Sequence, residues 1–360
     1  MGEATTWRQV GRQLVGLGPH AGAHRVALRA GASVLVPLLA LWAIDHQEWS
    51  IYAAFGAFTS LYGRNHIRLS RTRMQVTLAV LLTAATTAGV VAGLSAHRAW
   101  LAVPATALVA VGGSLVSDAQ DWHPPGPLFL VFAFAACASL PSEPGDVLAA
   151  VLVAGASAGF SVLVGGVGGW WRHARAGTAG SGSAASAQAG SGPVVRRASY
   201  GEVARRHALR NGLAVAIAGA IATVAGIGHP YWAMVSAVVP LASRDLGRQV
   251  TRGLHRVIGT GLGLALAALL FALDPRGLLL ILVIVLLQVG AELLVGRNYA
   301  LALVAVTPLA LLMVHVVAPT PAGTLLWDRG VETVIGVVIG LGVGYLTRRP
   351  ARTPAEGALR

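Results

Sequence analysis

Residues 277–291 read GLLLILVIVLLQVGA, an apolar run without a charged side chain. Runs of this kind recur along the whole chain, which is 55% hydrophobic and only 11% charged. Soluble domains carry roughly 25% charged residues. A water-exposed fold has no way to bury this much apolar surface, so the sequence predicts an all-α integral membrane protein.

The apolar runs predict about twelve transmembrane helices, because runs of this kind recur along the whole chain. They divide into two sets of six. The runs cover residues 26–44, 49–62, 74–94, 99–116, 125–140 and 147–169 in the first set, and 209–226, 231–243, 257–273, 277–291, 299–318 and 331–346 in the second.

The segments outside these runs complete the expected domain organisation. Trp7, Val10 and Leu14 fall at helical spacing between arginines, which predicts an amphipathic helix lying on the membrane surface. The Gly-, Ser- and Ala-rich stretch 174–193 is typical of a flexible linker. The expected parts are an amphipathic segment 1–25, a first six-helix membrane repeat 26–170, a linker 171–206, a second six-helix repeat 207–347 and a tail 348–360.

The two sets of helices also resemble each other in sequence. The Ala27-Leu28-Arg29-x-Gly31 motif matches Ala208-Leu209-Arg210-x-Gly212 at an offset of 181. Three further matches share an offset of 183. They are Trp49 with Trp232, Arg73 with Arg256 and Thr77 with Thr260. We expect two parallel repeats related in this register.

The arginines predict the topology. All 27 basic residues are arginine, and if every run crosses the membrane, 24 fall on the side of the N-terminus against three on the other. By the positive-inside rule, both termini and the linker are expected in the cytoplasm, and the protein in the plasma membrane. The basic net charge is thus a topology signal, and we expect lipid rather than nucleic acid as the surrounding partner.

The second run of each set, 49–62 and 231–243, is short for a bilayer about 30 Å thick. A re-entrant loop is the alternative, but it places the arginine-rich linker outside the cell, against the charge count. Short segments at matching positions of two repeats also point to a transport site.

Several motifs in the second set together resemble the fusaric acid resistance family, also called aromatic acid exporters. They are His229-Pro230-Tyr231-Trp232, Arg256-x-x-Gly259-Thr260-x-x-Gly263, Arg297-Asn298-Tyr299-Ala300-Leu301, Thr307-Pro308 and Arg329-x-x-Glu332-Thr333-x-x-Gly336. This family is similar in its membrane fold to the plant aluminium-activated malate transporters.

The resemblance implies a membrane transporter that exports organic or aromatic acid anions, and a fused pseudo-dimer of two six-helix units. A passive anion channel and a non-transporting membrane scaffold are the alternatives. The large soluble domains of many family members have no counterpart in this chain. We expect no enzyme activity, no cofactor and a small organic anion as the partner, and the sequence is compatible with a homo-oligomer.

The candidate anion-binding residues are Arg73 and Arg256, which follow the two short runs. The planar guanidinium matches a carboxylate, although interfacial anchoring is the simpler interpretation. Trp49, Tyr231 and Trp232 open the short runs. They are either aromatic-belt residues or an aromatic wall that stacks on the substrate.

The other charged residues within the apolar runs are candidates for structural or proton-coupling roles. Glu292 lies five residues before Arg297, and an ion pair or interfacial placement is favoured over coupling. Arg329 and Glu332 are an i, i+3 pair at the start of the last run. His315 is expected to be a hydrogen-bonded packing residue.

The remaining motifs favour packing over chemistry. Gly155-Ala156-Ser157-Ala158-Gly159 matches the nucleophile-elbow pattern, but it lies within a predicted membrane helix, so small-residue packing explains it better. The Gly336, Gly340 and Gly344 series is interpreted in the same way. Asp118 and Asp121 lack a third ligand, so we expect no metal site. Cys137 lies inside an apolar run as the chain's single cysteine, which excludes an intrachain disulfide.

Overall fold

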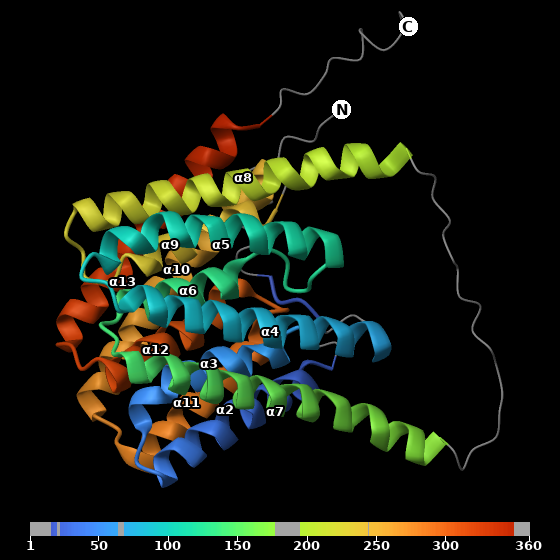
Figure 1. Ribbon diagram of the computed structural model, residues 1–360, viewed down its shortest axis with the longest axis vertical. Coiled ribbons are helices and arrows are strands. Elements are labelled where there is room, and N and C mark those ends of the chain that lie inside the picture. The colour runs from blue at the N-terminus through green and yellow to red at the C-terminus, as the bar shows by residue number, and fades with distance from the viewer. Residues whose placement is uncertain (1–15, 20–21, 64–67, 177–194, 244, 349–360) are drawn as a thin grey trace, which may run out of the picture.

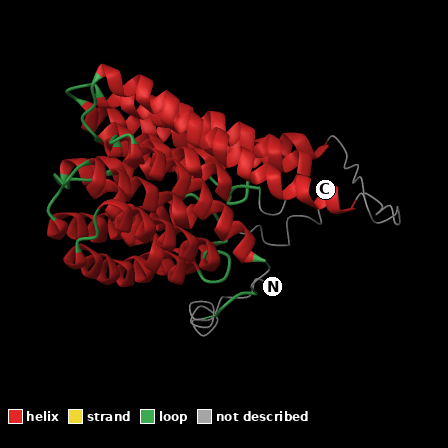
Figure 2. Cartoon of the chain, turned by 90° about the horizontal axis from the view of Figure 1, so that it is seen from below, coloured by secondary structure: helices red, strands yellow, loops and turns green. Residues whose placement is uncertain are grey.

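The protein is described by a computed structural model that covers residues 16–19, 22–63, 68–176, 195–243 and 245–348. In this part of the chain, all regular secondary structure is helical (Figures 1 and 2). The helices in chain order are α2 (Ala23–Ala43), the 3-10 turn η1 (Gln47–Trp49), α3 (Ser50–Ala57), the 3-10 turn η2 (Phe58–Leu61), α4 (Arg68–Gly93), α5 (Arg98–Gln120), α6 (Leu128–Ser139), α7 (Pro144–Ala176), α8 (Val195–Val224), α9 (Tyr231–Leu241), α10 (Leu246–Leu273), α11 (Gly277–Leu294), α12 (Tyr299–Val317) and α13 (Ala322–Leu346).

Each of the twelve predicted apolar runs coincides with a helix, which confirms the all-α membrane fold. Of the helices that the structure describes, nine are long and apolar enough to cross a bilayer. The others are α3 with η2, α6 and α9. The predicted run 125–140 is thus shorter than expected, since α6 has only 12 residues.

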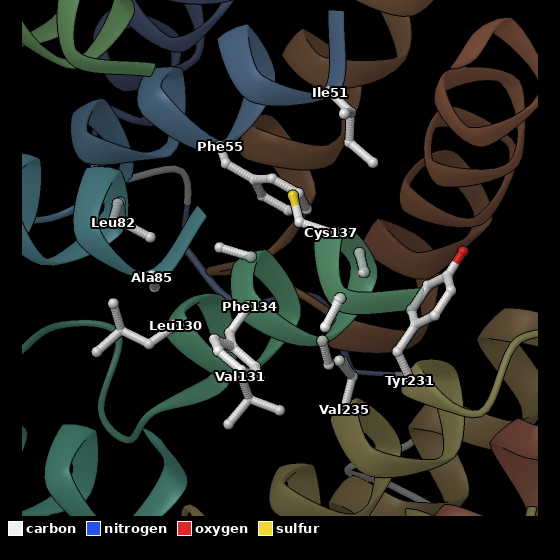
Figure 3. Close-up of a cluster of buried hydrophobic side chains, with 14 of the residues drawn as sticks. Ile51, Phe55, Leu82, Ala85, Leu130, Val131, Phe134, Cys137, Tyr231 and Val235 are labelled. Carbon is white, nitrogen blue, oxygen red and sulfur yellow. The ribbon is translucent and has the colours of Figure 1, made fainter. Parts of the chain in front are cut away.

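The short helices lie inside the bundle rather than against lipid. Every residue of α9 is buried, and so are seven of the eight residues of α3. Figure 3 shows Phe134 and Cys137 of α6 between Phe55 of α3 and Tyr231 of α9. A helix surrounded by protein need not match the thickness of the bilayer, because its ends contact other helices instead of lipid headgroups.

The contacts between helices repeat from one half to the other. Helix α4 packs against α6 and α7 in the first half, as α10 packs against α12 and α13 in the second. Across the halves, α5 packs against α8, and α11 packs against α2 (Figure 1). The first helix of each half thus contacts the fourth helix of the other, as expected for two parallel repeats related by a pseudo-twofold axis.

The second and sixth helices of each half show the structural register of the repeat. Ser157 on α7 donates a 2.7 Å hydrogen bond to the carbonyl of Ala53 on α3. In the second half, Gly336 on α13 leaves no room for a Cβ against the carbonyl of Ala233 on α9. Ala53 therefore corresponds to Ala233, an offset of 180, and Ser157 corresponds to Gly336, an offset of 179.

The third helix follows a different offset. Gln75 on α4 contacts Gly165, and Gln249 on α10 contacts Gly344, so Gln75 corresponds to Gln249 at an offset of 174. The predicted offset of 183 is therefore wrong for this helix. The counterpart of Arg256 is Leu82, not Arg73. The loop before α4 is longer than the loop before α10, and this insertion displaces the sequence match.

Helix α7 ends and α8 begins at the same end of the bundle (Figure 1). This arrangement agrees with an even number of crossings in the first half. Most of the predicted amphipathic segment, residues 177–194 of the linker and residues 349–360 of the tail lie outside the described residues. The assignment of this end to the cytoplasm stays a prediction.

Candidate functional site

A cavity of about 370 Å³ lies between the two halves. All three short helices contribute to its walls, through residues such as Phe55 of α3, Phe132 of α6 and Val238 of α9. Helices α10, α11 and α12 complete the second-half side, and α13 contributes Arg329. The volume is in the range of pockets that enclose small ligands.

The first half gives the cavity an aromatic wall. Phe55 contacts Phe132 edge-on at 5.1 Å between ring centroids, and Phe58 lies 4.9 Å from Phe129. Tyr62 extends this wall toward Phe129 at 5.8 Å. All five rings line the cavity. Aromatic faces and edges in this arrangement favour a flat, apolar ligand body.

Arg256 projects from α10 into the cavity and is only 4% exposed. Its Nη1 donates to the hydroxyl of Tyr299, and its Nη2 donates to Oγ of Ser236, both at 3.3 Å. Its Nε, also buried, has no acceptor. Both of these hydrogen-bond partners are neutral hydroxyls, and the ion pairs found among the described residues do not include Arg256.

Arg329 brings a second guanidinium to the same cavity from α13 and is 2% exposed. Its Cζ lies 5.2 Å from the ring centroid of Trp232, a cation–π contact. The buried Nε has no acceptor. The two guanidiniums are close enough to repel each other. An anion that binds both relieves this repulsion.

The exposed residues at the other end of the cavity mark its mouth. Arg252 lies one turn before Arg256 on α10 and is exposed. The other exposed lining residues, Pro124, Pro125 and Gly296, belong to the same end of the bundle. Helix α10 begins there with an N-cap at Asp245, whose side chain accepts from the Arg248 N–H at 2.9 Å. The cavity therefore opens at the end where α7 ends and α8 begins.

The predicted Arg73 and Arg256 pair is not a pair in the structure. Arg73 is exposed and does not line the cavity, whereas Arg256 is buried within it. The physical reason is the register of the repeat, because the apolar Leu82 takes the position in the first half that Arg256 takes in the second.

The three predicted aromatic residues have different surroundings. Trp49 stacks on His46 at 4.0 Å, is partly buried and does not line the cavity. Tyr231 and Trp232 are buried at 2% and 0% exposure, so the aromatic-belt interpretation is wrong for them. They lie behind the cavity wall, where Trp232 supports Arg329 and Tyr231 stacks on Phe132 at 6.2 Å.

The predicted ion-pair residues have different surroundings in the structure. Glu292 lines the cavity near its mouth, while Nε of Arg297 donates to the carbonyl of Gly18 at 3.2 Å. Glu332 is fully buried and accepts from the backbone N–H of His229 at 3.2 Å. Arg329 turns toward Trp232 and the cavity instead of forming a hydrogen bond with Glu332.

The motifs interpreted as packing elements are found in packing contacts. Ser157 donates to a backbone carbonyl within the bundle, and Gly336 and Gly340 let α13 approach α9. Nδ1 of His315 donates to the carbonyl of Thr320 at 3.1 Å. Asp118 bonds His207 at 3.0 Å across the α5/α8 contact. Among the described residues, no group of three His, Cys, Asp or Glu side chains is arranged to hold a metal ion.

Residues 216–343, from α8 to α13, match the family described as fusaric acid resistance protein-like. The uncharacterized membrane protein YvaC of Bacillus subtilis (strain 168) is 31% identical over 144 residues, which cover 39% of this chain and 23% of YvaC. The match thus spans about a quarter of that relative. No solved structure matches the chain. The second half of this multi-pass membrane protein thus matches the fusaric acid resistance family, which confirms the resemblance carried by its arginine and glycine motifs.

Proposed function

We propose that this protein transports organic acid anions through the cavity between its halves, and that aromatic acids are its preferred substrates. The observation that carries the proposal is the pair of buried guanidiniums, Arg256 and Arg329, neither of which hydrogen-bonds a carboxylate. A buried guanidinium whose N–H groups meet no carboxylate has donors left for an anion from solution. The carboxylate is expected to bind the two arginines through charge-assisted hydrogen bonds.

The aromatic wall supports the choice of substrate class. Phe129 and Phe132 lie on the first-half side of the cavity, opposite the second-half helix that carries Arg256. A flat aromatic acid fits this division, with its carboxylate at the arginines and its ring against the phenylalanines. The family description, which names resistance to an organic acid, agrees with this assignment.

The proposed direction is export across the plasma membrane. The cavity opens at the end of the bundle where α7 ends and α8 begins, and the arginine distribution predicts that this end faces the cytoplasm. A cavity open to the cytoplasm loads substrate from inside the cell. The relation to the plant aluminium-activated malate transporters stays a prediction.

The test is flux of benzoate and of acetate in proteoliposomes that contain the purified protein. We expect saturable benzoate flux that is accelerated by unlabelled benzoate on the opposite side. Arg256→Gln and Arg329→Gln are expected to lower benzoate affinity at least tenfold, since each removes a charge-assisted interaction of about 1.5–3 kcal/mol. Arg276→Gln is the matched control, because Arg276 is exposed in the α10–α11 turn and pairs with Asp274.

The same assay distinguishes the alternatives. A passive anion channel gives flux without acceleration by substrate on the opposite side. A membrane scaffold gives no flux of either acid. Wild-type flux in both arginine variants, at equal protein density, contradicts the proposed binding site.

A further inference from the structure

A buried cluster of ionizable groups lies directly behind Arg329, away from the mouth of the cavity. Nδ1 of His229 lies 2.8 Å from Oδ2 of Asp328, and the backbone N–H of His229 donates to Oε1 of Glu332 at 3.2 Å. The second carboxyl oxygen of Glu332 is buried and has no hydrogen-bond partner. His229 also stacks on Trp232 at 4.7 Å, the same ring that Arg329 covers.

In the absence of an anion, the formal charges of this cluster cancel those of the two arginines in the cavity. Arg256 and Arg329 carry two positive charges, and ionized Asp328 and Glu332 carry two negative charges, with His229 neutral. A bound monoanion makes this buried assembly negative by one charge. Uncompensated charge is costly inside a membrane protein, and one added proton restores neutrality.

The helices around the cluster contribute few other ionizable groups. Helix α8 has none in its last turns, since residues 211–224 read NGLAVAIAGAIATV. Glu292 and Arg252 lie at the mouth, on the far side of the cavity. In the part of the chain that the structure describes, the other titratable or charged groups that face the cluster are Tyr231 of α9, Cys137 of α6, Arg256 of α10 and Tyr299 of α12.

We propose that His229, Asp328 and Glu332 form a proton-binding site that takes up one proton when an organic anion binds to Arg256 and Arg329. The inference rests on the proposed function, because it requires an anion in the cavity. Protonation of the cluster also frees Arg329 from the attraction of Glu332, so that its guanidinium is fully available to the carboxylate. Anion and proton therefore bind with positive cooperativity, and each strengthens the binding of the other equally.

The two ligands reach the assembly from opposite ends of the bundle. The anion enters through the mouth beside Arg252. The proton reaches His229, whose side chain is 14% exposed and which lies in the α8–α9 turn at the other end. A proton taken up there comes from the water on the side that the arginine distribution predicts to be outside the cell.

The experiment is calorimetric titration of the purified full-length protein with benzoate in buffers of different ionization enthalpy. The dependence of the binding heat on buffer enthalpy gives the number of protons taken up. For the wild type we expect about one proton per benzoate at neutral pH and above, and an affinity that falls about tenfold for each pH unit in that range. Benzoate itself stays ionized there.

Two variants test the assignment to the cluster. Glu332→Gln removes one negative charge, so the assembly with bound benzoate is already neutral. We expect it to bind benzoate without proton uptake and with an affinity that no longer depends on pH. Asp328→Asn also removes one negative charge from the cluster, and it takes the place of Glu332→Gln in the experiment if that variant does not fold. Asp118→Asn is the control, because it breaks another carboxylate–histidine pair, a partly buried one with His207 outside the cavity.

The outcomes separate the two proposals. Benzoate binding to the wild type without proton uptake overturns the proton site and leaves the anion site standing. Proton uptake that persists in both cluster variants also overturns it. A folded wild-type protein that does not bind benzoate contradicts the proposed function, and the inference with it.

Discussion

Replacement of Arg256 by methionine is expected to stabilise the empty protein and to weaken anion binding. In the empty state, the buried guanidinium has only the hydroxyls of Ser236 and Tyr299 as partners and is repelled by Arg329. Methionine fills a similar volume without a charge. If anion binding is what compensates the burial of this charge, the same substitution raises the stability of the empty protein and lowers its affinity for the anion.

The magnitudes follow from the environment of the side chain. Burial of an ion costs several kcal/mol, which the substitution removes, and the lost bonds to neutral hydroxyls subtract about 0.5–1.5 kcal/mol each. We expect a net stabilisation of about 1 kcal/mol or more. For the carboxylate, loss of one or two charge-assisted bonds of about 1.5–3 kcal/mol weakens binding at least tenfold.

Thermal unfolding in detergent, followed by the emission of the nine tryptophans, measures both effects. We expect the Arg256→Met variant to unfold at a higher temperature than the wild type without ligand, and to need at least tenfold more benzoate for the same further shift. Leu82→Met is the matched control, because Leu82 holds the equivalent position in the first half. A variant that is less stable than the wild type when empty and still shifted by the same benzoate concentrations refutes the reasoning.

Three further predictions concern the wall, the helix packing and the topology. Phe132→Ala is expected to weaken benzoate binding by about 0.5–1.5 kcal/mol beyond any effect on acetate, measured by competition in the flux assay. Gly336→Val is expected to cost about 1–3 kcal/mol of stability in thermal unfolding because its side chain overlaps α9, whereas Gly342→Val, which has open space, is expected to be neutral. A thiol introduced at Ser186 is expected to resist membrane-impermeant reagents added outside intact cells, while one at Asp274 reacts; the reverse pattern inverts the predicted topology.

The positions of the helices could be predicted from the sequence because bilayer-length apolar runs interrupted by charged turns allow few other structures. The shortness of α3 and α9 was also visible, and both helices line the cavity. The register of the repeat was not visible. Alanine- and glycine-rich helices match each other at several offsets, and the side chains that distinguish them, Gln75 and Gln249, do so only through their contacts with α7 and α13.

Only the charged residues of the site could be predicted from the sequence. Arg256 was identified because a charge near an apolar run is conspicuous, and Arg329 was found but assigned to an ion pair with Glu332. The aromatic wall was missed because Phe129 and Phe132 lie in an apolar run that reads like any membrane helix. The nearest signal was the unusual number of phenylalanines between 129 and 134, which alone does not separate a cavity wall from a lipid-facing surface.

The unequal division of the site between the halves follows from their fusion into one chain. In a symmetric dimer, a buried arginine at the Arg256 position is necessarily present twice, and so are its electrostatic cost and its repulsion. In this chain, the corresponding positions of the first half hold Leu82 for Arg256 and Ala150 for Arg329, both fully buried and apolar. One half can therefore supply the charges and the proton cluster while the other supplies the aromatic wall. This arrangement concentrates the buried charges at one site, where, by the proposed coupling, one anion and one proton bind without changing the net charge.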